Sequence, residues 1–259
     1  MESLFETFFP DQLWILGVLG FLLLLIAEIG YRMGKSVPAR EDEAAKSEIG
    51  GYLGAVLGLL ALLLGFTFSM ALNHYDLRRS LVVQEANSIG TTYLRASFLP
   101  GEAREISRRL LREYVELRVR DADALLNQSS LLKQVAGIQD ALWKQAESSA
   151  GLAATPITAS YITSLNEMID LASTRLAAAR YRVPVALWLM LLIVALFGMW
   201  AAGFSAGVNG KRALFLTIGL PVLITLVLLL ITDISSPLRG LIRNDETSML
   251  ELRDSMKQP

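Results

Sequence analysis

Uncharged segments at both ends of the chain, separated by a polar middle, dominate the pattern of its 259 residues. Residues 49–72, 183–210 and 213–232 carry no charged side chain, and residues 13–31 carry only Glu28, near their end. Each segment is long enough to cross a hydrocarbon core of about 30 Å as a helix. The pattern therefore predicts four transmembrane helices, which we place at residues 13–31, 49–73, 183–206 and 213–232.

The first of these segments is interpreted as a retained membrane anchor. Residues 1–12 contain Glu2, Glu6 and Asp11 but no basic residue, whereas a cleaved signal peptide begins with a basic stretch and ends at small residues. Glu28 lies close enough to the end of the segment to reach interfacial water or to pair with Arg32 one turn later.

The helix of the second span is expected to continue well beyond the membrane. No proline or glycine follows residue 73 until Gly90, so we predict a helix that runs on to about Ser97. Its apolar residues keep a 4, 3, 4, 3 spacing, which is typical of one buried helix face. These residues are Val82, Ala86, Ile89, Tyr93 and Ala96.

Three more amphipathic helices follow, with apolar stripes over residues 106–117, 131–142 and 157–176. The small and polar run 148–154 reads as a loop, and Thr155 with Pro156 predicts the N-cap and first position of the third helix. A kink or break is expected near Pro184. No strand pattern occurs. The sequence predicts an all-α protein with four transmembrane helices and a helical-bundle domain, residues 74–182, inserted between the second and third spans.

The remaining segments are predicted to be short connections, residues 32–48 and 207–212, and a C-terminal tail, residues 233–259. Basic residues flank the spans on both sides of the membrane. Six lie on the side of the two short connections and seven on the side of the helical domain. The positive-inside rule, applied to the first helix, places the N-terminus and the domain outside, but the two counts are nearly equal.

Composition excludes several classes of chemistry. The net charge of −1 argues against nucleic-acid binding, and the absence of cysteine excludes thiolate nucleophiles and cysteine metal sites. The single histidine, His74, follows the second span, where it is either an interfacial anchor or one member of an ionisable ring in an oligomer. We find no nucleotide-binding loop or catalytic motif. We therefore predict no catalytic residue, no metal site, no cofactor and no enzymatic activity.

Small residues repeat along one face of the second span. Gly50, Gly54, Gly58, Gly65 and Ser69 occupy this face, which allows another helix to approach closely. We interpret it as a helix-packing seam, with a pore-lining face as the alternative. Gly203 and Gly207 repeat the theme in the third span.

Bulky apolar residues of the second span are candidates for a constriction. Phe66 and Phe68 point about 200° apart on a helix, so only one of them can face a central axis. If this helix lines a pore, one of them with Leu62 or Leu72 makes a hydrophobic constriction. Otherwise these side chains make ordinary contacts with lipid or with other helices.

Three motifs resemble a family of bacterial membrane proteins described as bestrophin-like. The first motif is Gly65, Phe66, Phe68 and Ser69. The second, and most specific, is Arg79, Leu81, Val82, Glu85, Ala86, Asn87, Ile89, Gly90, Thr91, Tyr93, Leu94, Arg95, Leu99 and Pro100. The third is Pro237, Arg239, Gly240, Leu241 and Ile242.

The resemblance implies a function that the residues alone do not give. Bestrophins are pentameric anion channels with four spans, a cytoplasmic helical domain after the second span, and a second span that lines the pore. The acidic run that holds calcium in animal bestrophins is absent here, so calcium gating is not implied. The polar signature residues are Arg79, Glu85, Asn87, Arg95 and Arg239. Of these, Glu85 and Asn87 are expected to cap or cross-link helices of the bundle or to face a vestibule.

Two hypotheses follow, and both place the protein in the bacterial inner membrane with the lipid bilayer as a partner. A channel for inorganic anions must be a homo-oligomer, a pentamer if it is bestrophin-like, because four apolar spans cannot enclose a water-filled path. The alternative is a membrane-anchored scaffold without a pore, whose helical domain binds a partner. No nucleic-acid partner is expected in either case.

Overall fold

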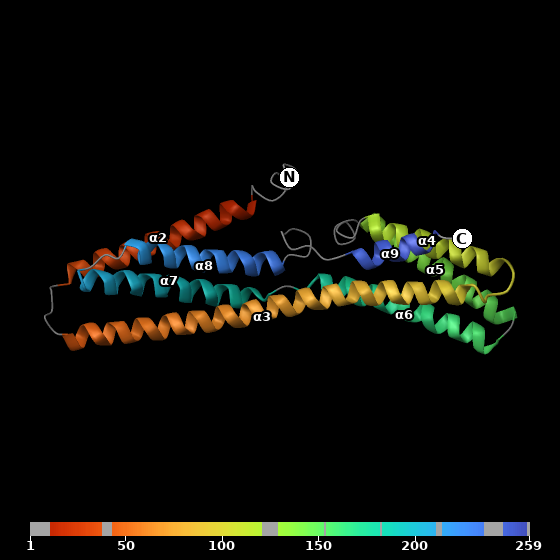
Figure 1. The fold of residues 1–259 in the computed structure, drawn as a ribbon, viewed down its shortest axis with the longest axis horizontal. Coiled ribbons are helices and arrows are strands. Elements are labelled where there is room, and N and C mark those ends of the chain that lie inside the picture. The colour runs from red at the N-terminus through yellow and green to blue at the C-terminus, as the bar shows by residue number, and fades with distance from the viewer. Residues whose placement is uncertain are drawn as a thin grey trace. The chain divides into compact units, whose positions relative to one another are not determined.

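The computed structural model describes residues 11–37, 43–120, 129–152, 154–181, 183–210, 214–235 and 246–257. Within these ranges the regular structure is entirely helical, which confirms the all-α part of the predicted fold class (Figure 1). The helices are α2 (Asp11–Ser36), α3 (Glu43–Ala96), α4 (Glu102–Arg120), α5 (Ser129–Leu152), α6 (Pro156–Ala179), α7 (Val185–Val208), α8 (Leu214–Ser235) and α9 (Thr247–Ser255).

Four of these helices are long and apolar enough to cross a membrane. The qualifying segments are Gly17–Ser36 of α2, Ala44–Ala96 of α3, Val185–Val208 of α7 and Thr217–Ser235 of α8. They overlap the four segments that the hydrophobic pattern singled out, with ends that differ by a few residues and, for α3, by many more. Helix α2 continues to Ser36 and α3 begins at Glu43, so both helices extend into the predicted connection 32–48.

The chain folds as two compact units, and α3 contributes to both. The apolar unit comprises Met1–Asn73 and Arg182–Ile242, and the polar unit comprises His74–Tyr181 and Arg243–Pro259. Helix α3 is continuous from Glu43 to Ala96, as the lack of helix-breaking residues predicted. The break predicted near Pro184 is also present, because α6 ends at Ala179 and α7 begins at Val185.

In the apolar unit, α2 and α7 approach each other through glycines. A Cβ atom on Gly30 would overlap the carbonyl oxygen of Trp200, and one on Gly203 would overlap that of Ala27. Gly34 and Gly207 repeat this arrangement one turn later. Because the contacts advance in the same direction along both helices, α2 and α7 run parallel. Close backbone approach of this kind is a common way to pack helices in lipid.

A cluster of buried apolar side chains completes the apolar unit. Leu23 and Ala27 of α2, Leu191, Ala195 and Met199 of α7, and Ile224 and Leu228 of α8 form it together with Leu60 of α3. Leu60, Thr67 and Ala71 are the buried residues of α3 in this unit. Their spacing of seven and four residues places them on one side of the helix. The chain therefore covers α3 along a single side.

The polar unit is a bundle of α4, α5, α6, α9 and the second part of α3 around one core. Its fully buried side chains include Ile89, Tyr114, Leu142, Leu165 and Met168. Thr155 caps α6 as predicted: its side chain accepts a hydrogen bond from the Thr158 backbone N–H, and the Thr155 backbone N–H donates one to the Thr158 hydroxyl.

Two features of the polar unit differ from the sequence prediction. Residues 148–152 are helical and not a loop, since α5 continues to Leu152 and buries Ser149 against the bundle. Helix α9 was not predicted. It packs on α4 and contributes Met249 and Met256 to the core. Both differences arise because packing against the bundle outweighs a weak local preference.

The close glycine contacts between α2 and α7 give a direct stability prediction. Gly30→Ala should lower the melting temperature of the detergent-solubilised protein by roughly 2–10 °C, because overpacking costs about 1–3 kcal/mol. Gly17→Ala on the same helix is the matched control, since a Cβ at Gly17 meets no atom within 4 Å. Equal melting temperatures for the two variants would contradict the close approach of α2 and α7 at Gly30.

Candidate functional site

The small face of α3 is not covered by any described part of its own chain. A Cβ atom added to Gly50, Gly54, Gly58 or Gly65 would meet no atom within 4 Å, and Ser69 is exposed. By contrast, the seam inside the apolar unit uses glycines of α2 and α7. The residues expected to pack helices on α3 therefore present an uncovered surface in the single subunit.

Three of the four predicted constriction residues lie on the same uncovered side. Leu62, Phe66 and Leu72 are 54%, 64% and 39% exposed, whereas Phe68 is half-buried. We use the name α3 open face for Gly50, Gly54, Gly58, Leu62, Gly65, Phe66, Ser69 and Leu72. Its residues carry no charge, and its middle part combines small residues with two bulky apolar ones.

In the polar unit, the signature residue Glu85 is the centre of a buried network. Its side chain is fully buried, and its Oε2 accepts hydrogen bonds from Arg118 Nη2 at 2.6 Å and Arg175 Nη1 at 2.9 Å. Its Oε1 accepts one from the Tyr114 hydroxyl at 3.2 Å. One carboxylate thus connects α3 with α4 and α6, which makes it a cross-link of the bundle core.

The network reaches two further elements through its arginine and tyrosine. Arg175 Nη2 donates to Glu246 Oε1 at 2.5 Å, immediately before α9. The amide of Gln139 on α5 donates to the Tyr114 hydroxyl at 3.4 Å. The two carboxylates balance the two guanidinium groups, so the buried cluster carries no net charge.

Electrostatics keeps the Glu85 carboxylate ionised and the Tyr114 phenol neutral. Burial alone would raise the pKa of Glu85, but the charges and hydrogen bonds of Arg118 and Arg175 outweigh burial and hold that pKa below its ordinary value. Burial and the neighbouring Glu85 carboxylate raise the pKa of Tyr114, so its phenol remains a hydrogen-bond donor. Neither residue has the accessible, solvated environment of a catalytic group.

The other signature residues are dispersed. Arg95 donates to the backbone oxygen of Ser160 at 3.0 Å and so links α3 to α6, whereas Asn87 and Arg79 are exposed. Arg239 lies outside the described residues. Sequence reasoning missed the partners of Glu85. The one available signal was the position of Glu85 beside an apolar stripe, because a carboxylate buried there requires a cation nearby.

Removal of the negative charge of Glu85 should strongly destabilise the polar unit. Glu85→Gln leaves Arg118 buried without a counter-ion, which typically costs about 3–5 kcal/mol. Hydrogen exchange of the full-length protein should show loss of protection in α4 and in the part of α3 that follows His74. Glu113→Gln, an exposed change of the same type on α4, should be close to neutral. The double variant Glu85→Gln, Arg118→Met should recover part of the loss; no recovery would refute the pairing.

The depressed pKa of Glu85 also predicts a pH dependence. A carboxyl whose folded pKa lies below its ordinary value of 4.5 contributes stability above that pH and loses it as the pH falls through the folded pKa. The stability difference between wild type and Glu85→Gln should therefore be constant from pH 7 to about pH 5 and then shrink on acidification. Urea unfolding at a series of pH values measures it, and a constant difference down to about pH 2 would contradict this assignment.

The same fold occurs in proteins of known structure. The fold is similar to crystal structures of single-substitution variants of a bacterial bestrophin homologue from Klebsiella pneumoniae. One has a TM-score of 0.65 and 17% identity, and covers 95% of this chain and 98% of the other. A second has a TM-score of 0.62 and 19% identity, and covers 96% of this chain and all of the other. No curated protein sequence matches the chain.

The family model for the Bestrophin-like domain matches residues 20–249. This range includes α3, α7, α8 and α2 from residue 20 onward, and with them the α3 open face and the buried Glu85 network. The match confirms the family to which the three sequence motifs pointed. The four apolar helices, together with this match, indicate a membrane protein. The chain belongs to the Bestrophin-like family.

Proposed function

We propose that the protein is a multi-pass protein of the bacterial inner membrane that assembles as a homo-oligomeric ion channel, with a pentamer as the expected form. The α3 open face is the observation that carries this proposal. It is uncharged, rich in small residues and left uncovered by its own chain. Several copies arranged around an axis would bring these faces together around a central path.

The parallel packing of α2 and α7 supports the membrane topology of this proposal. Because these helices run in the same direction, the chain enters both from the same side, and the membrane part of α3 makes the return crossing between them. This supports a topology in which residues 74–182 form a domain inserted between the second and third spans. The N-terminus and that domain then share one side of the membrane.

Along the proposed pore, Phe66 and Leu62 are the best candidates for the constriction. Both side chains project from the α3 open face, and a ring of such apolar groups can close a pore by excluding water. Phe68 is half-buried and is a weaker candidate. The proposed wall has no charge over residues 49–72. The wall therefore has no charge that would select for anions. We include permeation by inorganic anions in the proposal because the chain resembles bestrophins, which are anion channels.

The competing scaffold hypothesis differs in assembly. A scaffold needs neither a ring nor an open path, and the α3 open face would then contact lipid or one partner helix. Native mass spectrometry of the protein released from nanodiscs separates the two: a pentamer supports the channel, whereas a monomer or dimer eliminates it. No catalytic step is proposed.

Two phenylalanine substitutions test the pore assignment. In liposomes loaded with chloride, Phe66→Ala should increase flux severalfold relative to wild type because it widens the proposed constriction. Phe68→Ala should change flux much less, which makes it the matched control. Parallel sodium-flux measurements report the selectivity. Equal effects of the two substitutions, at unchanged subunit stoichiometry, would remove Phe66 from the pore.

A further inference from the structure

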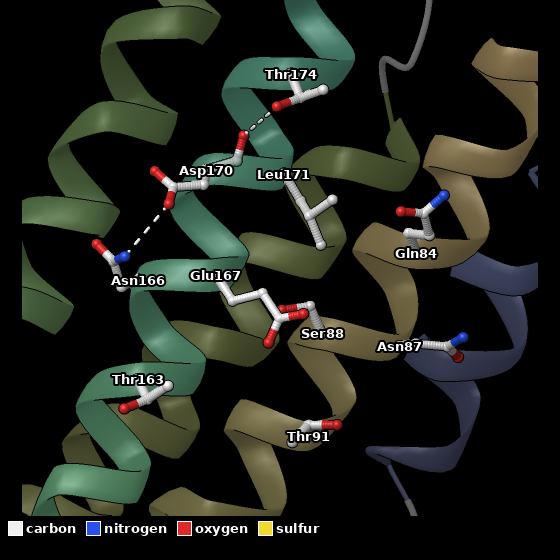
Figure 2. Close-up of a pocket in the computed structure, with 10 residues that line it drawn as sticks. All are labelled: Gln84, Asn87, Ser88, Thr91, Thr163, Asn166, Glu167, Asp170, Leu171 and Thr174. Atoms are coloured by element: carbon white, nitrogen blue, oxygen red, sulfur yellow. Dashed lines mark hydrogen bonds between the residues drawn. The ribbon is translucent and has the colours of Figure 1, made fainter.

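A polar groove of about 630 Å³ lies between α3 and α6 in the polar unit (Figure 2). Nine of its ten lining residues are polar, and none is basic. The lining residues are Gln84, Asn87, Ser88, Thr91, Thr163, Asn166, Glu167, Asp170, Leu171 and Thr174. Its position and lining separate it from both the α3 open face and the buried Glu85 network.

The negative charge of the groove comes from two carboxylates on α6. Asp170 Oδ2 accepts one hydrogen bond, from Asn166 Nδ2 at 3.2 Å, which leaves most of its capacity as an acceptor unused. The Glu167 side chain is exposed and projects into the groove. The two acids are three positions apart, so their Cβ atoms lie about 5–6 Å from each other on neighbouring positions of the helix surface.

Ser88 supplies an independent sign that the groove holds a ligand. Its side chain is only 6% exposed, and its hydroxyl has no hydrogen-bond partner among the described residues. Figure 2 shows this side chain on α3 pointing toward Glu167 on α6. A buried hydroxyl without a partner is unfavourable, so a polar group in the groove would satisfy it.

Two arginines that are close in sequence to the lining residues are engaged elsewhere. Arg95, one turn beyond Thr91, donates to the Ser160 backbone oxygen, and Arg175, next to Thr174, binds Glu85 and Glu246. They therefore do not fill the groove, and its carboxylates are available to an external cation.

We propose that this groove binds a small linear polyamine, a cation with two or more protonated amines. Ammonium groups joined by three or four methylenes are about as far apart as the Cβ atoms of Glu167 and Asp170, about 5–6 Å, and the flexible chain of a polyamine can follow the two carboxylates. Their N–H groups are donors for both carboxylates and for the Ser88 hydroxyl. A metal ion fits less well, because the described residues contain no group of three or more His, Asp or Glu side chains that could hold one.

Isothermal titration of spermidine into the full-length protein tests the proposal. Nanodiscs of zwitterionic lipid avoid the binding of the polyamine to anionic headgroups. One spermidine should bind per subunit. Glu167→Gln combined with Asp170→Asn should weaken binding about ten-fold or more, the equivalent of at least one charge-assisted hydrogen bond. Asp140→Asn, an exposed change on α5, is the matched control and should bind like wild type.

Two further measurements separate a built site from general attraction of cations. Ser88→Ala should weaken spermidine binding severalfold at an unchanged circular dichroism spectrum. Magnesium chloride at matched ionic strength should displace spermidine no better than sodium chloride does. Absence of binding, equal binding by the charge-removing and control variants, or preferential displacement by magnesium would each overturn the proposal. No ion conduction is needed, so failure here is distinct from failure of the channel hypothesis.

Discussion

The uneven covering of α3 is the constraint on which the rest of the architecture depends. This helix contributes to both compact units, yet in the apolar unit the chain buries only one of its sides. Large apolar side chains on an uncovered helix face can be left to lipid. A row of glycines cannot serve lipid in the same way, because it offers little side-chain surface and exposes backbone. The α3 open face therefore makes most sense as a surface completed by assembly.

The two units hold α3 by different physics. In the apolar unit, α2 and α7 pack through glycines, where backbone contact replaces the hydrophobic driving force that is absent in lipid. In the polar unit, a single carboxylate connects three helices through two arginines and a tyrosine. Such a network is costly to desolvate and adds little net stability over an apolar core, but it penalises every arrangement that breaks a pair. We infer that Glu85 specifies how α3, α4 and α6 register against one another.

Local sequence signals predicted where helices lie better than they predicted which helices and side chains contact one another. The length of α3 follows from an uninterrupted sequence, and the start of α6 follows from Thr155 and Pro156. Small-residue spacing predicted close packing equally for α3 and α7, but only α7 packs in this way within the subunit, because spacing carries no information about the partner. The arginines that bind Glu85 lie 33 and 90 positions away, beyond the reach of any helical pattern. Helix α9 depends on tertiary contacts of Met249 and Met256 and has no strong local signature.

Cysteine accessibility tests the central claim that the α3 open face lines an aqueous path. The sequence contains no cysteine, so a single introduced thiol is measured without background. Ser69 on the α3 open face and Leu189 on α7 are both exposed in the subunit, so both positions can carry a test cysteine. Only Ser69 is assigned to the water-filled path, whereas Leu189 is assigned to the lipid-facing surface. A membrane-impermeant thiol reagent applied to the protein in liposomes should modify Ser69→Cys and leave Leu189→Cys unmodified. Equal protection of both thiols would contradict a water-filled path along α3.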